Sequence, residues 1–151
     1  MDPATIIGTI GAVAGTLDVL AKIIRFMSDL RSRWMTSDIV LTTFEAQVVA
    51  VNSALLSVDE WVQTTNPESY PQLLRGVDLC VAQCATLADA IDLELASLQA
   101  LGTDKPRVVA KARRLLKTRE MSEIKRRITE KTHLLRKRYG KSKRTTHRCA
   151  L

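Results

Sequence analysis

The segment from Pro3 to Arg33 reads PATIIGTIGAVAGTLDVLAKIIRFMSDLRSR. Its apolar residues recur at alternating steps of four and three, which is the spacing of a helix that packs one face against its neighbours. Asp2 suits an N-cap position and Pro3 the first helical position. We therefore expect a helix from about Pro3 to Arg33. Its core row is Ile6, Ile10, Val13, Leu17, Leu20, Ile24 and Met27, widened by Ile7, Ala14 and Ala21.

Two further segments repeat this spacing. After a short break near residues 34–36, Ser37 and Asp38 suit a second helix start, and the sequence 64–67 (TTNP) should end that helix. A third helix should begin near Pro71 and end before a loop bracketed by Gly102 and Pro106. The predicted core rows are Phe44, Val48, Val51, Leu55, Val58 and Val62, then Val77, Val81, Cys84, Ala88, Ile91, Leu95 and Leu98, with Leu73, Cys80 and Leu87 beside the latter.

The last helix is predicted from roughly Arg107 to Tyr139, with Gly140 at its end. It has a thinner apolar row, and its other faces are crowded with Lys and Arg. This predicts a helical bundle over residues 1–139 and a flexible basic tail over 140–151. The row consists of Val109, Ala112, Leu116, Ile124, Ile128 and Leu135.

Composition agrees with an all-α fold. Aromatic residues make up 4% of the chain, and six Gly and four Pro leave little material for many turns. Short connections between long helices predict an elongated antiparallel bundle of four helices, with five as the alternative. A second interpretation is helices that pair with another chain as a coiled coil, but wide apolar rows favour a closed core.

Charge is divided unevenly along the chain. Up to Asp104 there are five basic and 13 acidic residues, and from Lys105 onward 18 basic and three acidic. The basic end offers Arg136, Lys137, Arg138, Lys141, Lys143 and Arg144 as candidates for an anionic surface. A solvated tail, an anionic membrane and a nuclear-import or nucleic-acid role all remain open. Tyr139 alone interleaves with the cluster, so base stacking has little support.

The sequence contains no recognisable catalytic or cofactor motif. His133 and His147 have no acid or nucleophile at a suggestive spacing, and no glycine loop of the phosphate-binding kind occurs. Cys80 and Cys84 are expected to be buried, reduced thiols, because no His or third Cys completes a metal site. We therefore expect no enzyme activity, no metal, no cofactor and no small-molecule substrate.

The first helix combines an uncharged run, residues 4–17, with a row of small residues that includes Gly11 and Gly15. Such rows let membrane helices approach closely, and in a soluble bundle they simply let helices cross closely. Asp2 argues against a secretory signal. A conventional span is not expected, since Asp18 and Lys22 fall inside the one window judged long enough. A segment that is soluble while packed and apolar when released would fit the pattern.

Several motifs follow one another along the chain in a fixed order: Met1-Asp2-Pro3-Ala4, the run from Ile6 to Gly15, Cys80-Val81-x-x-Cys84-x-x-Leu87, Ile91-Asp92-x-Glu94-Leu95-x-x-Leu98, Arg113-Arg114-Leu115-Leu116-Lys117, and Glu123-Ile124 through Lys131-x-x-Leu134. Their order and spacing resemble the fungal N-terminal domains of STAND proteins, the HeLo-like domains that precede NACHT or NB-ARC modules. The resemblance covers about residues 1–137.

This resemblance implies a bundle of four or five helices that acts in fungal innate immunity, heterokaryon incompatibility and programmed cell death. Related domains are thought to oligomerise, expose the first helix and damage the plasma membrane. The implied executing segment is Ile6 to Leu20, with Ile6, Ile10, Gly11, Val13, Gly15 and Leu17 as candidates for membrane contact and self-association. Expected partners are a helical protein or a second copy, and anionic lipid. The expected location is the cytoplasm, with recruitment to the plasma membrane. The alternative is a soluble interaction bundle without membrane activity, or a basic nucleic-acid-binding protein.

Overall fold

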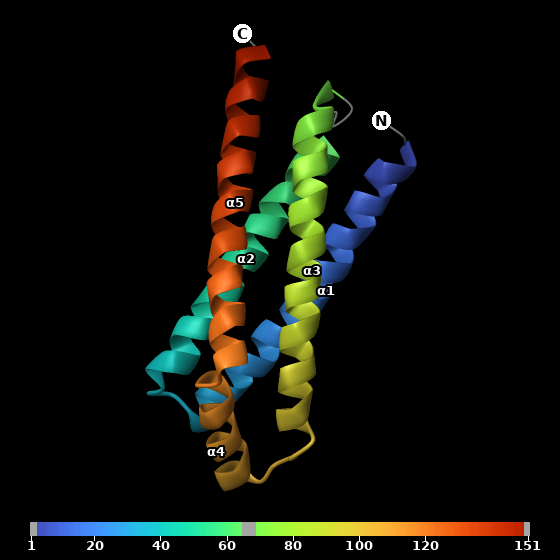
Figure 1. Cartoon of the computed structure of the whole chain (residues 1–151). Coiled ribbons are helices and arrows are strands. Elements are labelled where there is room, and N and C mark those ends of the chain that lie inside the picture. The colour runs from blue at the N-terminus through green and yellow to red at the C-terminus, as the bar shows by residue number, and fades with distance from the viewer. Residues whose placement is uncertain (1–2, 65–68, 150–151) are drawn as a thin grey trace.

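The computed structural model describes the backbone of residues 3–64 and 69–149, and the side chains of residues 8–64 and 69–137. In this part of the chain the regular secondary structure is helical and there is no strand, which confirms the predicted all-α class (Figure 1). The five helices are α1 (Pro3–Trp34), α2 (Ile39–Thr64), α3 (Pro71–Gln99), α4 (Lys105–Leu116) and α5 (Arg119–Cys149).

The four long helices form a ring in which α1 and α5 each pack against both α2 and α3. Figure 1 shows α1 and α3 running one way and α2 and α5 the other, so consecutive long helices are antiparallel, as predicted. However, α2 and α3 lie diagonally across the ring instead of side by side. The short α4 packs on α3 and α5 at the end where α1 turns into α2.

The second and third helices follow the sequence closely. Asp38 is confirmed as the cap of α2, because its Oδ1 accepts the Leu41 N–H at 3.0 Å. Every residue of the two predicted core rows is buried, with Phe44 and Ile91 fully enclosed. Of the residues expected beside the α3 row, Cys80 and Leu87 are buried and Leu73 partly buried. Gly102 adopts a left-handed φ of 64° in the loop after α3, while Pro106 already lies in the first turn of α4.

In α1 the buried row is displaced from the predicted one. Val13, Leu20 and Met27 belong to both rows and are buried. Ile10, Leu17 and Ile24 are only partly buried, and the side chain of Ile6 lies outside the described residues. The prediction that Ala14 and Ala21 widen the core was wrong, because both are exposed. The structure buries instead the row Thr9, Val13, Thr16, Leu20, Ile23, Met27 and Leu30.

The single last helix that the sequence predicts is two helices. The helix ends at Leu116 and restarts at Arg119, where the Thr118 Oγ1 accepts the Met121 N–H at 3.2 Å. Lys125 Nζ donates to the Leu116 carbonyl at 3.0 Å and lies 5.7 Å from the centre of the Phe44 ring. Burial lowers the pKa of Lys125. The break is thus held by side chains of α5.

The predicted row of this region is only partly the observed one. Ala112, Leu116, Ile128 and Leu135 are buried as expected, while Val109 and Ile124 are partly buried. Val108 and Met121 take their places in the core. The helix end predicted at Gly140 was wrong, since α5 continues to Cys149. The division into a bundle over 1–139 and a tail over 140–151 stays a prediction.

Candidate functional site

The first half of α1 buries one narrow row against the bundle. Thr9 and Val13 are fully enclosed and Thr16 nearly so. Thr9 Oγ1 donates to Asp78 Oδ1 of α3 at 2.8 Å, and Thr16 Oγ1 donates to the Ala12 carbonyl at 2.7 Å. The two hydroxyls thereby satisfy their hydrogen-bonding capacity inside the core. A row chosen for hydrophobicity alone misses both threonines.

The opposite face of this segment consists of small residues turned toward solvent. Gly8, Gly11 and Gly15 are exposed, and a Cβ placed on any of them would meet no atom of the described residues within 4 Å beyond its chain neighbours and the adjoining helix backbone. Ala12 and Ala14 are exposed as well. The interpretation that these glycines let helices cross closely inside the bundle is therefore wrong. They form an open uncharged surface, which we call the glycine face (Gly8, Gly11, Ala12, Ala14, Gly15).

Among the described residues, three polar side-chain contacts join α1 to its neighbours. Besides the Thr9–Asp78 hydrogen bond, Lys22 Nζ lies 3.3 Å from Asp92 Oδ1 on α3, and Arg31 binds Glu45 on α2. The hydrogen bond with Glu45 raises the pKa of Arg31. Lys22 is more than half exposed, so solvent screens its ion pair. Apolar packing therefore dominates the attachment of α1.

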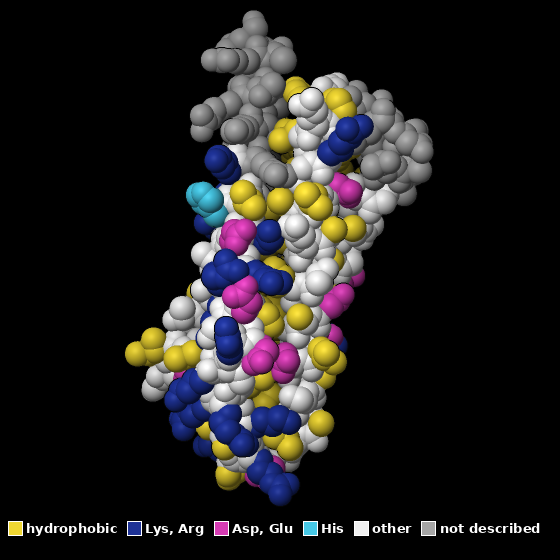
Figure 2. Space-filling view, in the orientation of Figure 1, with side chains coloured by type: hydrophobic (Ala, Val, Ile, Leu, Met, Phe, Trp, Pro, Cys, Tyr) yellow, Lys and Arg dark blue, Asp and Glu magenta, His cyan; other side chains and the backbone are white. Residues whose placement is uncertain are grey.

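The basic candidates fall at the far end of α5. Arg136 and Lys137 are exposed, whereas the side chains of Arg138, Lys141, Lys143 and Arg144 lie outside the described residues. Figure 1 places this end of α5 at the same end of the bundle as the start of α1. A second basic surface, at α4, was not singled out from the sequence, although Figure 2 shows Lys and Arg gathered there. Its exposed members are Lys105, Arg107, Arg113, Arg114, Lys117 and Arg119.

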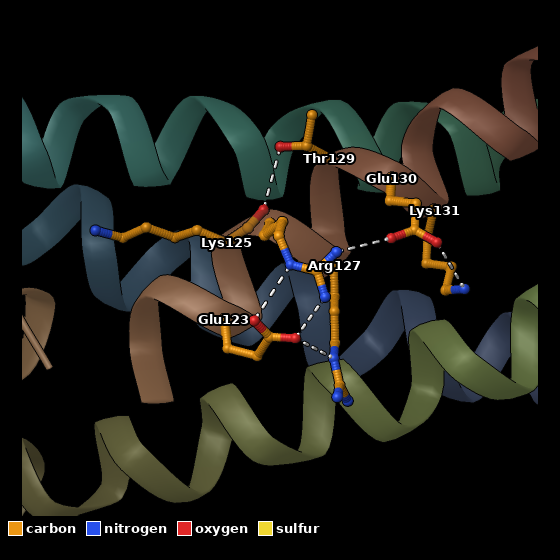
Figure 3. A network of polar contacts seen from close by, with 7 residues as sticks. Glu123, Lys125, Arg127, Thr129, Glu130 and Lys131 are labelled. Atoms are coloured by element: carbon orange, nitrogen blue, oxygen red, sulfur yellow. Dashed lines mark hydrogen bonds and ion pairs between the residues drawn. The ribbon is translucent and has the colours of Figure 1, made fainter. Parts of the chain in front are cut away.

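The middle of α5 carries a network in which acidic and basic side chains neutralise one another (Figure 3). Arg126 Nη2 donates to Glu123 Oε1 at 2.6 Å, and Arg127 Nε donates to the same oxygen at 3.1 Å. These hydrogen bonds, first that from Arg126, lower the pKa of Glu123 from 4.5 to about 2. This part of α5 thus offers anions fewer unpaired charges than its sequence indicates.

We expect Arg126→Gln to raise the pKa of Glu123, because it removes the largest cause of the shift. A carboxyl-carbon NMR titration of Glu123 would measure the change, with Arg75→Gln as a control at an exposed position on α3. Since the folded-state pKa lies below the ordinary one, the network stabilises the fold above about pH 4.5 and loses this effect between about pH 4.5 and 2. An unchanged pKa in Arg126→Gln would contradict the assignment.

A cavity of about 550 Å³ lies where the α1–α2 loop meets α4. Met35, Ile39 and Val40 supply apolar lining from one side, and Arg113 and Lys117 supply positive charge from the other. Arg113 Nε lies 3.7 Å from Asp38 Oδ2. The cavity therefore combines an apolar wall with cationic groups.

Among the cysteine and histidine candidates, the structure describes the side chains of Cys80, Cys84 and His133, while that of His147 lies outside the described residues. Cys80 and Cys84 are buried as predicted, and burial, with a smaller contribution from Cys80, raises the pKa of Cys84 to about 12. His133 is exposed on α5, beside Thr132 and Arg136 in a groove between α2 and α5. Among the residues searched, no cluster of three or more His, Cys, Asp or Glu could hold a metal ion.

Of the described helices, α2 alone is long and apolar enough to cross a membrane. This apolar window in α2 was not predicted from the sequence, where only the window around Asp18 and Lys22 was expected to be long enough. Core helices of soluble proteins pass the same test, and the inner side of α2 is buried. The helix is nevertheless poor in charge, with Glu45, Asp59 and Glu60 as its charged residues.

Comparisons with protein-family models, with curated proteins and with solved structures give no match to this chain.

Proposed function

We propose that this chain is a non-enzymatic signalling or effector domain of the HeLo-like, STAND-associated type. In this proposal α1 leaves the bundle, associates with α1 of other copies and enters a membrane to cause cell death. The observation that carries the proposal is the two-sided first half of α1. Residues 8–17 contain no charge, bury one row in the bundle and leave the glycine face open to a second helix.

The attachment of α1 is compatible with release. Its described polar contacts are few, and an exposed ion pair such as Lys22–Asp92 contributes only about 0.2–1 kcal/mol. Each interior glycine costs the helix about 0.5–1 kcal/mol relative to alanine. Gly8, Gly11 and Gly15 thus weaken the helix without improving its packing in the bundle. Glycines on an open face suit a contact made after release.

The position of the charges supports a membrane as the target. Arg136 and Lys137 are exposed near the end of α5, which lies at the same end of the molecule as the start of α1. Basic residues near an anionic surface contribute about 1 kcal/mol each. Contact of this end with the inner face of a plasma membrane would bring the start of α1 close to lipid. We propose the cytoplasm as the resting location.

A soluble interaction bundle is the second proposal, favoured by exposed apolar side chains away from α1. Leu79 and Leu93 lie two heptads apart on α3 and are 58% and 75% exposed. A partner helix that packs along this side of α3 would cover both side chains. In that case substitutions at Leu79 and Leu93 would abolish partner binding, and the chain would cause no dye leakage from vesicles.

The test is dye leakage from vesicles of mixed neutral and anionic phospholipid, with the full chain and Gly11→Leu. Small residues let membrane helices approach closely, so a leucine side chain at position 11 should prevent this contact and lower leakage several-fold. Ile10→Asp should also lower leakage, because a carboxylate near the bilayer centre costs about 2.5–3.5 kcal/mol.

Gly11→Leu is informative because the site has room for a side chain and the change favours helix. The variant should therefore be at least as stable as the original chain in urea unfolding. Ala110→Leu, at an exposed position of α4, is the matched control and should leave leakage unchanged. No leakage from the original chain, or equal leakage from Gly11→Leu, would overturn the proposal.

A further inference from the structure

The outer side of α2 carries a second row of residues at helical spacing. Its members recur at alternating steps of three and four, as in a coiled-coil seam, and none is charged. All are exposed, with Ile39 at 79% and Leu56 at 51%. The row lies opposite the buried one that contains Phe44 and Leu55. We call it the outer row: Ile39, Thr42, Ala46, Val49, Ser53 and Leu56.

We infer that a second copy of this chain covers the outer row, with the two α2 helices antiparallel about a two-fold axis. In this register each residue of the outer row faces a residue of the outer row on the second copy that fits it in size or polarity. Ile39 meets Leu56 of the second copy, Thr42 meets Ser53, and Ala46 meets Val49. Large residues face each other at the ends, hydroxyls face hydroxyls, and a small residue faces a larger one at the centre. A two-fold interface requires this kind of self-complementarity.

Charge agrees with the same register. One heptad step beyond Ser53 the row continues to Glu60, which is exposed. Antiparallel pairing sets Glu60 of the second copy about one helical turn beyond Ile39, at the end of α2 where the cavity lined by Arg113 and Lys117 lies. The two-fold axis makes this contact twice. Parallel pairing would place Glu60 against Glu60 of the other copy, which is unfavourable.

The interface is modest in size. The outer row spans 18 residues, about 26 Å at 1.5 Å per residue, and one helix pair of that length buries less than the roughly 1,200–2,000 Å² of standard interfaces. The dimer should accordingly depend on protein concentration. A bilayer is the less favoured occupant, since insertion of α2 would extract Phe44, Leu55 and the rest of the inner row from the core.

The first experiment is sedimentation equilibrium of the full chain without lipid, over a wide range of concentration. The mass should rise with concentration from 16.8 kDa toward twice that value. Val49→Arg places a charge at the centre of the row and should raise the dissociation constant at least roughly tenfold, as central interface positions do. Ala82→Arg, at an exposed position on α3, diagonally across the ring from α2, is the matched control and should leave the dissociation constant unchanged.

Charge exchange tests the register. Glu60→Lys and Lys117→Glu should each weaken the dimer several-fold, and the double variant should recover most of the loss. Chains with Ile39→Cys mixed with chains with Leu56→Cys should cross-link on oxidation much more than either alone, in a Cys149→Ser background; the remaining thiols, Cys80 and Cys84, are buried.

Three results would overturn the inference: a monomer at all concentrations, a dimer equally sensitive to Ala82→Arg, or cross-linking of Ile39→Cys chains with themselves. A monomer that binds vesicles through α2, with binding lost in Val49→Arg, would assign the outer row to lipid. The dimer experiment contains no lipid and leaves α1 unchanged, so its failure would not touch the proposed membrane activity.

Discussion

Leu55→Ala is expected to lower the free energy of unfolding by about 2–5 kcal/mol, the range for truncating an enclosed leucine. Leu55 has no exposed surface, while its neighbour Leu56 is 51% exposed. The same truncation at Leu56 should therefore cost less than about 1 kcal/mol. Urea unfolding followed by circular dichroism would measure both, with protein kept dilute so that association through the outer row does not contribute.

The adjacent pair controls for the chemical change, since both variants remove the same atoms from the same helix. Equal losses at the two positions would contradict the orientation of α2 in the ring. A large loss at Leu56 that appears only in concentrated protein would instead support the α2 dimer, because association stabilises the folded state by mass action.

A carboxylate at position 13 should destabilise the protein far more than one at position 14. Val13 is fully enclosed, and an uncompensated buried charge typically costs about 3–5 kcal/mol. Ala14 is exposed, so Ala14→Asp should change stability by less than about 0.5 kcal/mol. Urea unfolding at neutral pH would give both values.

The loss of stability in the Val13→Asp variant should also depend on pH. Burial raises the pKa of a carboxyl group, so the folded state binds its proton at higher pH than the unfolded state. The penalty of the variant should therefore shrink as the pH falls through that raised pKa, and Ala14→Asp should show no such recovery. Similar losses at positions 13 and 14 would mean that this part of α1 does not pack as described.

Where one apolar row dominated a helix, the sequence predicted the structure well. The inner rows of α2 and α3 are buried at every predicted position, and Asp38 and Pro71 mark helix starts as expected. In α1 two adjacent rows share Val13, Leu20 and Met27. The row with more isoleucine is the more hydrophobic and was predicted to be buried, but the structure buries the row that contains Thr9 and Thr16. Hydropathy cannot rank these rows, because partners such as Asp78 come from another helix.

The break between α4 and α5 could not be read from local sequence for a similar reason. No Gly or Pro marks it, and Lys125 stabilises it from two turns away, by capping Leu116 while packing on Phe44. For the candidate site, the sequence singled out Gly11 and Gly15 but not the side they face. The outer row of α2 was not predicted either, because the inner row of the same helix is more hydrophobic and dominates the pattern. The spacing from Ile39 to Leu56 was a usable signal.

The placement of the ion pairs has a practical consequence. Among the residues described, the pairs that join different parts of the ring are Lys22–Asp92, Arg31–Glu45 and Asp38–Arg113, while the others lie within single helices or their first turns. Apart from Thr9, Thr16 and Thr132, the described buried residues are apolar, and none of them is charged. Added electrolyte, which screens exposed charges beyond about 10 Å at 0.1 M, should hardly shift the unfolding midpoint. The same addition would weaken any contact that the basic residues of α4 and α5 make with an anionic partner. Ionic strength therefore distinguishes electrostatic binding, which salt weakens, from the stability of the fold, which salt leaves nearly unchanged.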